Sequence, residues 1–133
     1  MTHILIVEDS IDDLDLMRLA LRRAEIGAEL RSARDGVEAL RQLEDAELPA
    51  VVLLDLRLPR LDGFQVLERM RDDERLRHVP VVVLSSTDEA GDIRRAYELG
   101  ANSFVCKPLG FQAAQDVVGQ LGRYWAALNR RPD

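Results

Sequence analysis

Two alternating patterns of apolar residues run along the chain. In the first, short runs rich in β-branched residues predict strands. Three runs are nearly continuous in hydrophobicity, as is typical of parallel strands covered on both faces, and two are weaker. The strong runs are Ile4–Val7, Val51–Leu54 and Val81–Leu84, and the weak ones are Glu29–Ala33 and Ser103–Cys106.

In the second pattern, apolar residues recur between the strands at the three- and four-residue spacing of amphipathic helices. Their positions are Leu14, Met17, Leu21 and Ala24; Val37, Leu40 and Leu43; Phe64, Leu67 and Met70; Ile93, Ala96, Tyr97 and Gly100; and Phe111, Ala114, Val117, Val118, Leu121 and Trp125. Five strands alternating with five helices predict an α/β fold of (βα)5 order. Its parallel sheet is expected to carry helices on both faces.

Four helix starts are marked by a capping residue that is followed three positions later by an acidic residue or glutamine. The pairs are Ser10 with Asp13, Asp35 with Glu38, Asp62 with Gln65 and Ser86 with Glu89. We therefore expect both Asp-Gly pairs of the chain to begin helices, although Asp-Gly between two strands would predict a hairpin turn.

The composition is that of one compact globular domain. The 133 residues are 47% hydrophobic and 32% charged, and a chain of this length buries a substantial core. Lysine and arginine total 18 against 24 aspartates and glutamates, a formal charge of −6. This deficit of positive charge argues against a general binder of nucleic acid or of acidic membranes.

The single cysteine, Cys106, excludes a disulfide within the chain and a zinc site built on two or more cysteines. It fits a reducing compartment. Neither a secretory leader nor an apolar run of membrane-spanning length is apparent. We therefore expect a cytoplasmic protein in which Cys106 is a buried packing residue.

Polar residues follow four of the predicted strands, and the carboxyl ends of parallel strands form the ligand-binding edge of such a sheet. This edge is expected to collect Glu8 and Asp9, then Asp55, then Ser85–Thr87, and finally Lys107. Crowded carboxylates favour a cation between them, and Mg2+ suits carboxylates together with phosphate oxygens. An aspartate beside Mg2+ can attack phosphorus while a lysine and a hydroxyl bind the phosphoryl oxygens. The pattern therefore predicts phosphoryl transfer onto a carboxylate.

Each of these residues also has an ordinary interpretation when it is taken alone. Glu8 and Asp9 fit a polar loop, Asp55 a turn or a cap, and Lys107 a solvated surface side chain. The hydroxyls of Ser85–Thr87 fit helix capping. Their joint placement at one edge of the sheet favours the phosphoryl-transfer site.

Four ordered motifs, Ile4–Ser10, Leu53–Gly63, Pro80–Ser86 and Gly100–Pro108, resemble those of the receiver domain of two-component response regulators. The resemblance covers residues 3–128. The intervals match as well, since the third motif's Ser85 follows Asp55 by 30 positions. The resemblance implies a doubly wound, flavodoxin-like (CheY-like) five-stranded parallel sheet. The receiver domain is expected over residues 1–128, with a short polar tail over 129–133 and no effector domain.

The resemblance also implies roles for the residues at the edge of the sheet. Asp55 is the implied phosphoacceptor, and Lys107 and Ser85 are its implied catalytic partners. The implied cofactor is Mg2+, with ligands from Glu8, Asp9, Asp55 and the backbone carbonyl of Arg57. Lys107 is expected to pair with the phosphate, and its bond to Pro108 is expected to be cis.

Ser85 is the implied switch hydroxyl, and Phe104 is the implied aromatic residue that moves with it. Three residues depart from the commonest pattern of the family. Arg57 stands where a smaller polar residue is common, and either its guanidinium acts on the phosphoryl group or only its carbonyl matters. Ser85 replaces a threonine and keeps the hydroxyl, whereas Phe104 lacks a tyrosine hydroxyl.

The implied function is that of a stand-alone receiver that accepts its phosphoryl group from a histidine kinase and signals through protein contacts. The implied output surface is formed by the fourth helix, the fifth strand and the fifth helix. The segments Leu84–Asp88 and Tyr97–Asn102 and the aromatic pair Tyr124-Trp125 resemble those of receivers that partner bacterial phytochrome histidine kinases. No nucleic acid and no membrane are expected as partners.

A second copy of the chain is a further candidate partner, in a homodimer whose interface is the output surface or the C-terminal helix. Trp125 either belongs to such an interface, because aromatics are enriched in interface cores, or covers the end of the protein's own core.

Three alternatives remain at this point. One is a Mg2+-dependent phosphatase with an aspartyl nucleophile, although Arg57 occupies the position where that class usually carries a second aspartate. Another is an interaction module that takes no phosphate. The third is a receiver that drains phosphate from its kinase as a sink. The expectation is a signalling protein that catalyses only its own phosphorylation and dephosphorylation.

Overall fold

The computed structural model describes residues 2–132, and it contains one five-stranded parallel sheet with the strand order β2-β1-β3-β4-β5. The strands are β1 (His3–Val7), β2 (Glu29–Ala33), β3 (Val51–Leu54), β4 (Val81–Ser85) and β5 (Ser103–Cys106). The helices are α1 (Ile11–Arg23), α2 (Gly36–Gln42), α3 (Gly63–Asp72), α4 (Ala90–Glu98), α5 (Phe111–Arg123) and the π-helix η1 (Tyr124–Leu128). The predicted (βα)5 fold with a doubly wound parallel sheet is confirmed.

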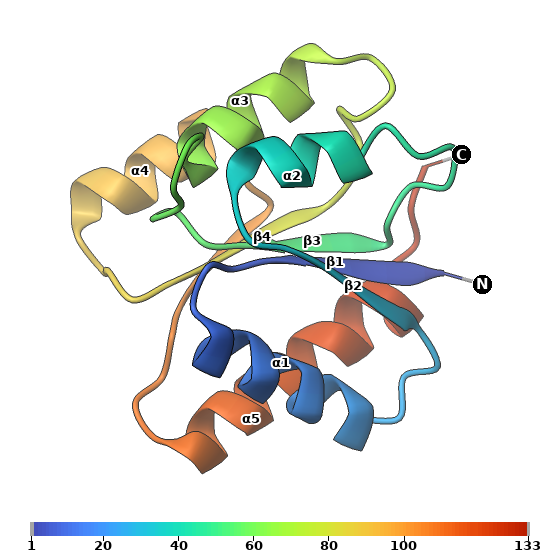
Figure 1. The fold of residues 1–133 in the computed structure, drawn as a ribbon, viewed down its shortest axis with the longest axis vertical. Helices are drawn as coiled ribbons and strands as arrows, with labels where there is room; N and C mark the ends of the chain where they lie inside the picture. The colour runs from blue at the N-terminus through green and yellow to red at the C-terminus, as the bar shows by residue number, and fades with distance from the viewer. Residues whose placement is uncertain (1, 133) are drawn as a thin grey trace.

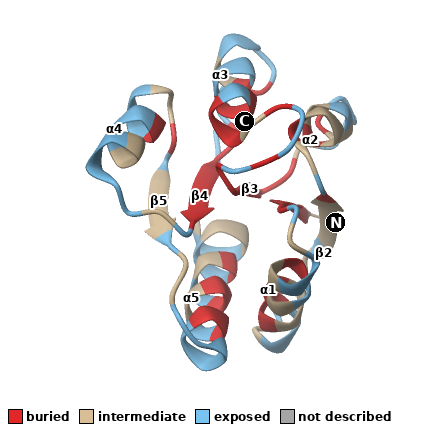
Figure 2. Ribbon diagram, turned by 60° about the vertical axis from the view of Figure 1, so that its left-hand side comes forward, coloured by how far each residue is buried: buried red, intermediate tan, exposed pale blue. Residues whose placement is uncertain are grey.

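Helices cover both faces of the sheet, with α1 and α5 on one side and α2, α3 and α4 on the other (Figure 1). Alternate residues of a strand point to opposite faces. Ile4 and Ile6 of β1 accordingly pack with the α1 and α5 side, and Leu5 and Val7 pack with the other side. The central strands β1, β3 and β4 are buried throughout (Figure 2), which explains their continuous apolar sequences.

The strand register brings the ends of the central strands to one edge. Val7 lies opposite Leu54 in the pairing of β1 with β3. The ladder continues for one more residue, because the Asp55 N–H donates to the Val7 carbonyl at 3.0 Å. In the pairing of β4 with β5, the Lys107 N–H donates to the Ser85 carbonyl at 2.7 Å. The residues that follow β1, β3 and β5 are thereby fixed by backbone bonds at the same edge.

Three of the four predicted helix starts are confirmed. The side chains of Ser10, Asp35 and Asp62 cap α1, α2 and α3, and Asp62 forms a full capping box with Gln65. These caps satisfy amide groups that the first helical turn leaves without partners.

The predicted start at Ser86 is wrong, because α4 begins at Ala90 and Glu89 caps it without a side-chain bond. The hydroxyl groups before α4 instead stabilise a turn. The Thr87 N–H donates to Ser85 Oγ at 3.3 Å, and the Glu89 N–H donates to Thr87 Oγ1 at 3.2 Å.

The expectation that Cys106 is buried is also wrong. The thiol is exposed, and Sγ lies 3.4 Å from the carbonyl oxygen of Thr87. The physical reason is that β5 is an edge strand, the last in the strand order, so that no strand pairs with one of its two sides. A run of apolar residues does not reveal which strand is an edge strand.

The C-terminal helix continues beyond α5 as the π-helix η1. Trp125 packs against the core on the α1 and α5 side, and its ring meets Tyr124 edge to face with centroids 5.0 Å apart. This contact fits the interpretation in which Trp125 covers the protein's own core. Within residues 2–132, no helix combines the length and the apolar character that crossing a membrane requires.

Candidate functional site

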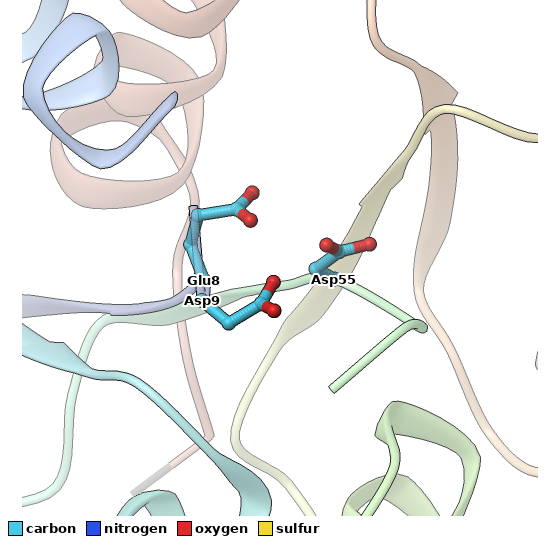
Figure 3. Close-up of side chains that lie close together, drawn as sticks. All are labelled: Glu8, Asp9 and Asp55. Atoms are coloured by element: carbon cyan, nitrogen blue, oxygen red, sulfur yellow. The ribbon is translucent and has the colours of Figure 1, made fainter. Parts of the chain in front are cut away.

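Three carboxylates meet where β1 and β3 end. One oxygen from each of Glu8, Asp9 and Asp55 lies within 4.8 Å of the others. Figure 3 shows the three side chains turned toward a common space. Glu8 and Asp55 are buried, and Asp9 is exposed. The cluster therefore has a buried floor and an open side toward solvent.

Backbone packing fixes the position of Asp55. The N-terminus of α3 approaches this loop closely, because the Gly63 N–H donates to the Leu56 carbonyl at 3.0 Å. A Cβ atom on Gly63 would overlap the Asp55 carbonyl oxygen and lie 2.7 Å from the Cα of Leu56. Glycine is required here because only a residue without a side chain permits this approach.

Lys107 reaches into the cluster from the end of β5. Its Nζ lies 2.6 Å from Glu8 Oε1, 3.0 Å from Asp13 Oδ2 and 3.6 Å from Asp55 Oδ2. The side chain of Lys107 is only 19% exposed, so these are partly desolvated ion pairs. The ammonium thus bridges the end of β1, the first turn of α1 and the end of β3.

Asp13 is a site residue that the sequence reasoning missed. The sequence pattern predicts Asp13 only as the partner of the Ser10 cap, and its N–H does donate to Ser10 Oγ at 3.3 Å. Its side chain also binds Lys107. The position of Asp13 in the first turn of a helix next to the acidic pair is the signal that could have revealed this second role.

The expected cis bond between Lys107 and Pro108 is wrong, since no peptide bond within residues 2–132 is cis. The trans form is the ordinary preference of such bonds. With this geometry the Lys107 ammonium still reaches Glu8.

The charges of the cluster perturb one another. Burial raises the pKa of Glu8 to about 7, and the negative charge of Asp55 adds to this effect while the bond from Lys107 opposes it. Burial lowers the pKa of Lys107, but the bonds and charges of Glu8, Asp13 and Asp55 outweigh burial and raise this pKa overall. One ammonium faces several carboxylates, so the lysine stays charged while Glu8 binds a proton readily.

This donor set fits a small, hard divalent cation. Its oxygens come from carboxylates, which Mg2+ prefers as ligands. The negative charges outnumber the lysine that faces them. A divalent cation in the space between the three side chains would relieve this repulsion and would displace the proton from Glu8.

Ser85 lies fully buried at the end of β4. Phe104 pairs with Val83 in the register of β4 and β5, so its side chain points to the same face of the sheet as that of Ser85. Phe104 is partly buried against the core on the α2–α4 side, and its N–H donates to the Tyr97 hydroxyl at 3.2 Å. The two residues therefore share a face and belong to neighbouring strands.

Arg57 lies just beyond Asp55, and its N–H donates to Asp55 Oδ1 at 3.4 Å. Its guanidinium does not turn to the carboxylate cluster. Instead Nη2 lies 3.1 Å from Asp92 Oδ2 in the first turn of α4. The sequence reasoning missed Asp92, because nothing in the local pattern indicates a partner 35 residues away.

Residues 4–118 match the family model described as the response regulator receiver domain. The probable methanogenesis regulatory protein FilR2 of Methanothrix harundinacea is 41% identical over 134 residues, which cover 97% of this chain and 86% of that protein. Response regulator Rcp1 of Synechocystis sp. is 34% identical, over 92% of this chain and 87% of that protein.

Solved structures of similar proteins have the same fold. The phosphorylated cyanobacterial phytochrome response regulator RcpA has a TM-score of 0.93 and 32% identity, over 99% of each chain. The Mn2+-bound form of Rcp1 has a TM-score of 0.92 and 32% identity, over 100% of each chain. The bacteriophytochrome response regulator AtBRR is 43% identical, with a TM-score of 0.76 over 98% of this chain and 99% of that one.

Proposed function

The chain belongs to the response regulator receiver family, and from this premise we propose that it accepts a phosphoryl group from a histidine kinase on Asp55 in a Mg2+-dependent reaction. The observation that carries the proposal is the position of Asp55. Its carboxylate is buried beside two further carboxylates and lies 3.6 Å from the Lys107 ammonium. These are the surroundings that an aspartyl nucleophile for phosphorus requires.

The chemistry is a displacement at phosphorus. A carboxylate oxygen of Asp55 forms the new P–O bond, and the P–N bond of the kinase's phosphohistidine breaks. The electron pair of that bond stays on the imidazole nitrogen, which takes up a proton. The Lys107 ammonium donates to the oxygens of the transferred group. Its raised pKa keeps it protonated for this role.

The proposed Mg2+ ligands are the carboxylates of Glu8, Asp9 and Asp55 and the backbone carbonyl of Arg57. Bound Mg2+ would screen the negative charge of the incoming phosphoryl group. Glu8 and Lys107 form a direct ion pair at 2.6 Å, so Mg2+ would compete with the lysine for the Glu8 carboxylate.

The proposed switch uses Ser85 and Phe104. Phosphorylation adds roughly 1.5 to 2 negative charges and three acceptor oxygens beside Asp55. Ser85 Oγ can then exchange its bond with the Thr87 N–H for a bond to the phosphoryl group, and Phe104 follows on the same face of the sheet. The surface of α4, β5 and α5 changes shape as a population shift.

The surface beside the site suits a protein donor. The start of α1, the loop that follows Lys107 and the start of α5 each expose one large apolar side chain, from Ile11, Leu109 and Phe111 respectively. Phe111 lines a groove of about 470 Å3 between α1 and α5, and Ile11 and Leu109 are sequence neighbours of other residues that line it. We assign this groove to the segment of the kinase that carries the phosphohistidine, because its lining includes Asp12 and Pro108, the sequence neighbours of the ion-paired Asp13 and Lys107.

The likeness to RcpA, Rcp1 and AtBRR supports a kinase of phytochrome type. The cytoplasm is the proposed location of this reaction. A homodimer through the α4-β5-α5 face or the C-terminal helix stays a prediction, for which the exposed Tyr124 and Leu128 of η1 offer apolar area.

The phosphatase alternative is disfavoured by Arg57. A phosphatase of that type needs a general acid and base two residues after its nucleophile. An arginine does not give up its proton in proteins. In this protein its guanidinium is also occupied by Asp92.

The test is labelling with acetyl phosphate, followed by intact-mass measurement and peptide mapping. We expect one phosphoryl group per chain on Asp55 with Mg2+ and none with EDTA. The substitution Asp55→Asn abolishes the label, whereas Asp88→Asn, at an exposed acidic residue of the loop before α4, retains it. Label that persists in Asp55→Asn would overturn the proposal. Repeated turnover of an added phosphoester would instead identify a phosphatase.

A further inference from the structure

Helix α4 buries fewer residues than any of the other four helices that follow the strands. It has one buried residue, Ala96, and Figure 2 shows most of its surface as exposed. Its N-terminal residue Glu89 makes no side-chain capping bond. Little apolar area therefore holds α4 in place, so individual polar contacts weigh more heavily on its position than on that of the other helices.

Besides the packing of Ala96, three side-chain contacts within residues 2–132 connect α4 to its neighbours through a polar or charged group. Arg95 stacks on the ring of Phe64 with 4.1 Å between the guanidinium carbon and the ring centroid, and the Tyr97 hydroxyl accepts from the Phe104 N–H. The third contact is the ion pair of Asp92 with Arg57. Of these three contacts, it is the one that joins α4 to the loop that carries Asp55.

The Arg57–Asp92 ion pair is suited to exchange. The Arg57 side chain is 65% exposed and that of Asp92 is 19% exposed, so water reaches the guanidinium and weakens the ion pair by screening it. A phosphoryl group on Asp55 would offer the guanidinium a dianion that it can bind through two parallel hydrogen bonds. Arg57 is two residues from that group, and its backbone already contacts the Asp55 carboxylate.

We propose that Arg57 transmits phosphorylation to α4: its guanidinium leaves Asp92 for the phosphoryl group and so releases the first turn of the helix. This inference rests on the proposed phosphorylation of Asp55. Asp92 stays in the first helical turn after the exchange, where a carboxylate interacts favourably with the positive end of the helix. Helix α4 thus keeps its secondary structure and loses its connection to the β3–α3 loop.

The two charged partners play different parts in this mechanism. Asp92 holds Arg57 away from the site in the unphosphorylated protein, and it is a positioning residue. Arg57 is the group that contacts the phosphate afterwards. Removing the Asp92 carboxylate should therefore release α4 before phosphorylation. Exchanging the charges of positions 57 and 92 should restore the ion pair, but phosphorylation should then no longer release α4.

Hydrogen–deuterium exchange of the segment 86–94, with Mg2+ and with or without acetyl phosphate, tests the proposal. In the wild type we expect exchange to become about two- to fivefold faster on phosphorylation, the change that loss of one exposed ion pair produces. Asp92→Asn should exchange at the fast rate in both states. The combination of Arg57→Glu with Asp92→Arg should exchange slowly in both, because the cation then belongs to α4 itself.

Asp88→Asn is the matched control, since it removes a nearby negative charge that makes no ion pair within residues 2–132. Its exchange should accelerate on phosphorylation as that of the wild type does. The label on Asp55 is measured in every sample. A labelled wild type with unchanged exchange in this segment would overturn the inference alone. The inference would also be overturned if phosphorylation still accelerated hydrogen–deuterium exchange of this segment in Arg57→Gln. A wild type without label on Asp55 would overturn the proposed function and this inference with it.

Discussion

Lys107 Nζ lies 2.6 Å from Glu8 Oε1 and is thereby closer to the acidic pair than to Asp55, whose Oδ2 is 3.6 Å away. In the proposed reaction the lysine must turn from Glu8 to the phosphoryl group. The same movement would free Glu8 for Mg2+. The ion pair therefore couples occupation of the metal site to the availability of the lysine.

The substitution Lys107→Met should destabilise the metal-free protein by about 3 kcal/mol at pH 8, because it leaves the buried Glu8 carboxylate without its cation. The measurement is urea unfolding in EDTA. Adding Glu8→Gln to the same chain should recover most of the loss, because the buried charge is then absent as well. Equal stability of the single and double variants would contradict this explanation.

The pH dependence of stability should carry the signature of Glu8. Its pKa is about 7 in the folded protein against 4.5 for an ordinary glutamate, so the folded protein keeps a proton that the unfolded chain has released. The free energy of unfolding in EDTA should therefore fall as the pH rises from about 4.5 to about 7, by at most about 3 kcal/mol. The difference between wild type and Glu8→Gln isolates this contribution, and parallel curves would exclude it.

Addition of Mg2+ should raise the unfolding temperature, and more strongly at pH 8 than at pH 5.5, since the ion and the proton compete for Glu8. At a free concentration of one hundred times the dissociation constant, the stabilisation is about 2.7 kcal/mol. Thermal unfolding at the two pH values measures it. Asp9→Asn should weaken the effect, and a response to Mg2+ that survives Asp9→Asn and Asp55→Asn together would place the ion elsewhere.

Ser85→Ala should separate phosphorylation from switching. The variant keeps Asp55 and Lys107, so acetyl phosphate should still label it, but no hydroxyl remains to bind the phosphoryl group. We expect the NMR shift change of the Thr87 amide on phosphorylation to shrink strongly, while Ser85→Thr retains it. The Thr87 N–H also loses its acceptor in Ser85→Ala, at a cost of about 1 kcal/mol in stability. An undiminished shift change in the alanine variant would remove Ser85 from the switch.

Gly63→Ala should destabilise the protein by about 1 to 3 kcal/mol, because the new methyl group would press against the backbone of Asp55 and Leu56. Gly91→Ala in α4 is the matched control, since a Cβ there meets no atom within 4 Å. That change should be neutral or stabilising by about 0.5 to 1 kcal/mol. Chemical unfolding of both variants provides the comparison, and similar values for the two would show that the contact at Gly63 relaxes freely.

The fold was predictable because local signals and global topology agree. The apolar runs of β1 and β3 are continuous, since helices cover them on both sides, and alternation with helical spacing leaves a parallel sheet as the natural solution. The convergence of Glu8, Asp55 and Lys107 followed from the same fact, because the carboxyl ends of parallel strands lie at one edge.

The partners of these side chains could not be predicted in the same way. The contact of Asp13 with Lys107 and that of Asp92 with Arg57 join elements that are far apart in the sequence, and they depend on side-chain reach and helix rotation. The hydroxyls before α4 misled the prediction at Ser86, because a turn bond and a helix cap use the same residue types.

The exposed thiol of Cys106 gives the protein a built-in chemical probe. It is the only cysteine of the chain, it stands beside Lys107, and its sulfur contacts the Thr87 carbonyl in the loop that precedes α4. The rate at which a maleimide alkylates this thiol should therefore report the position of that loop, so the switching of the native sequence can be timed without an introduced label.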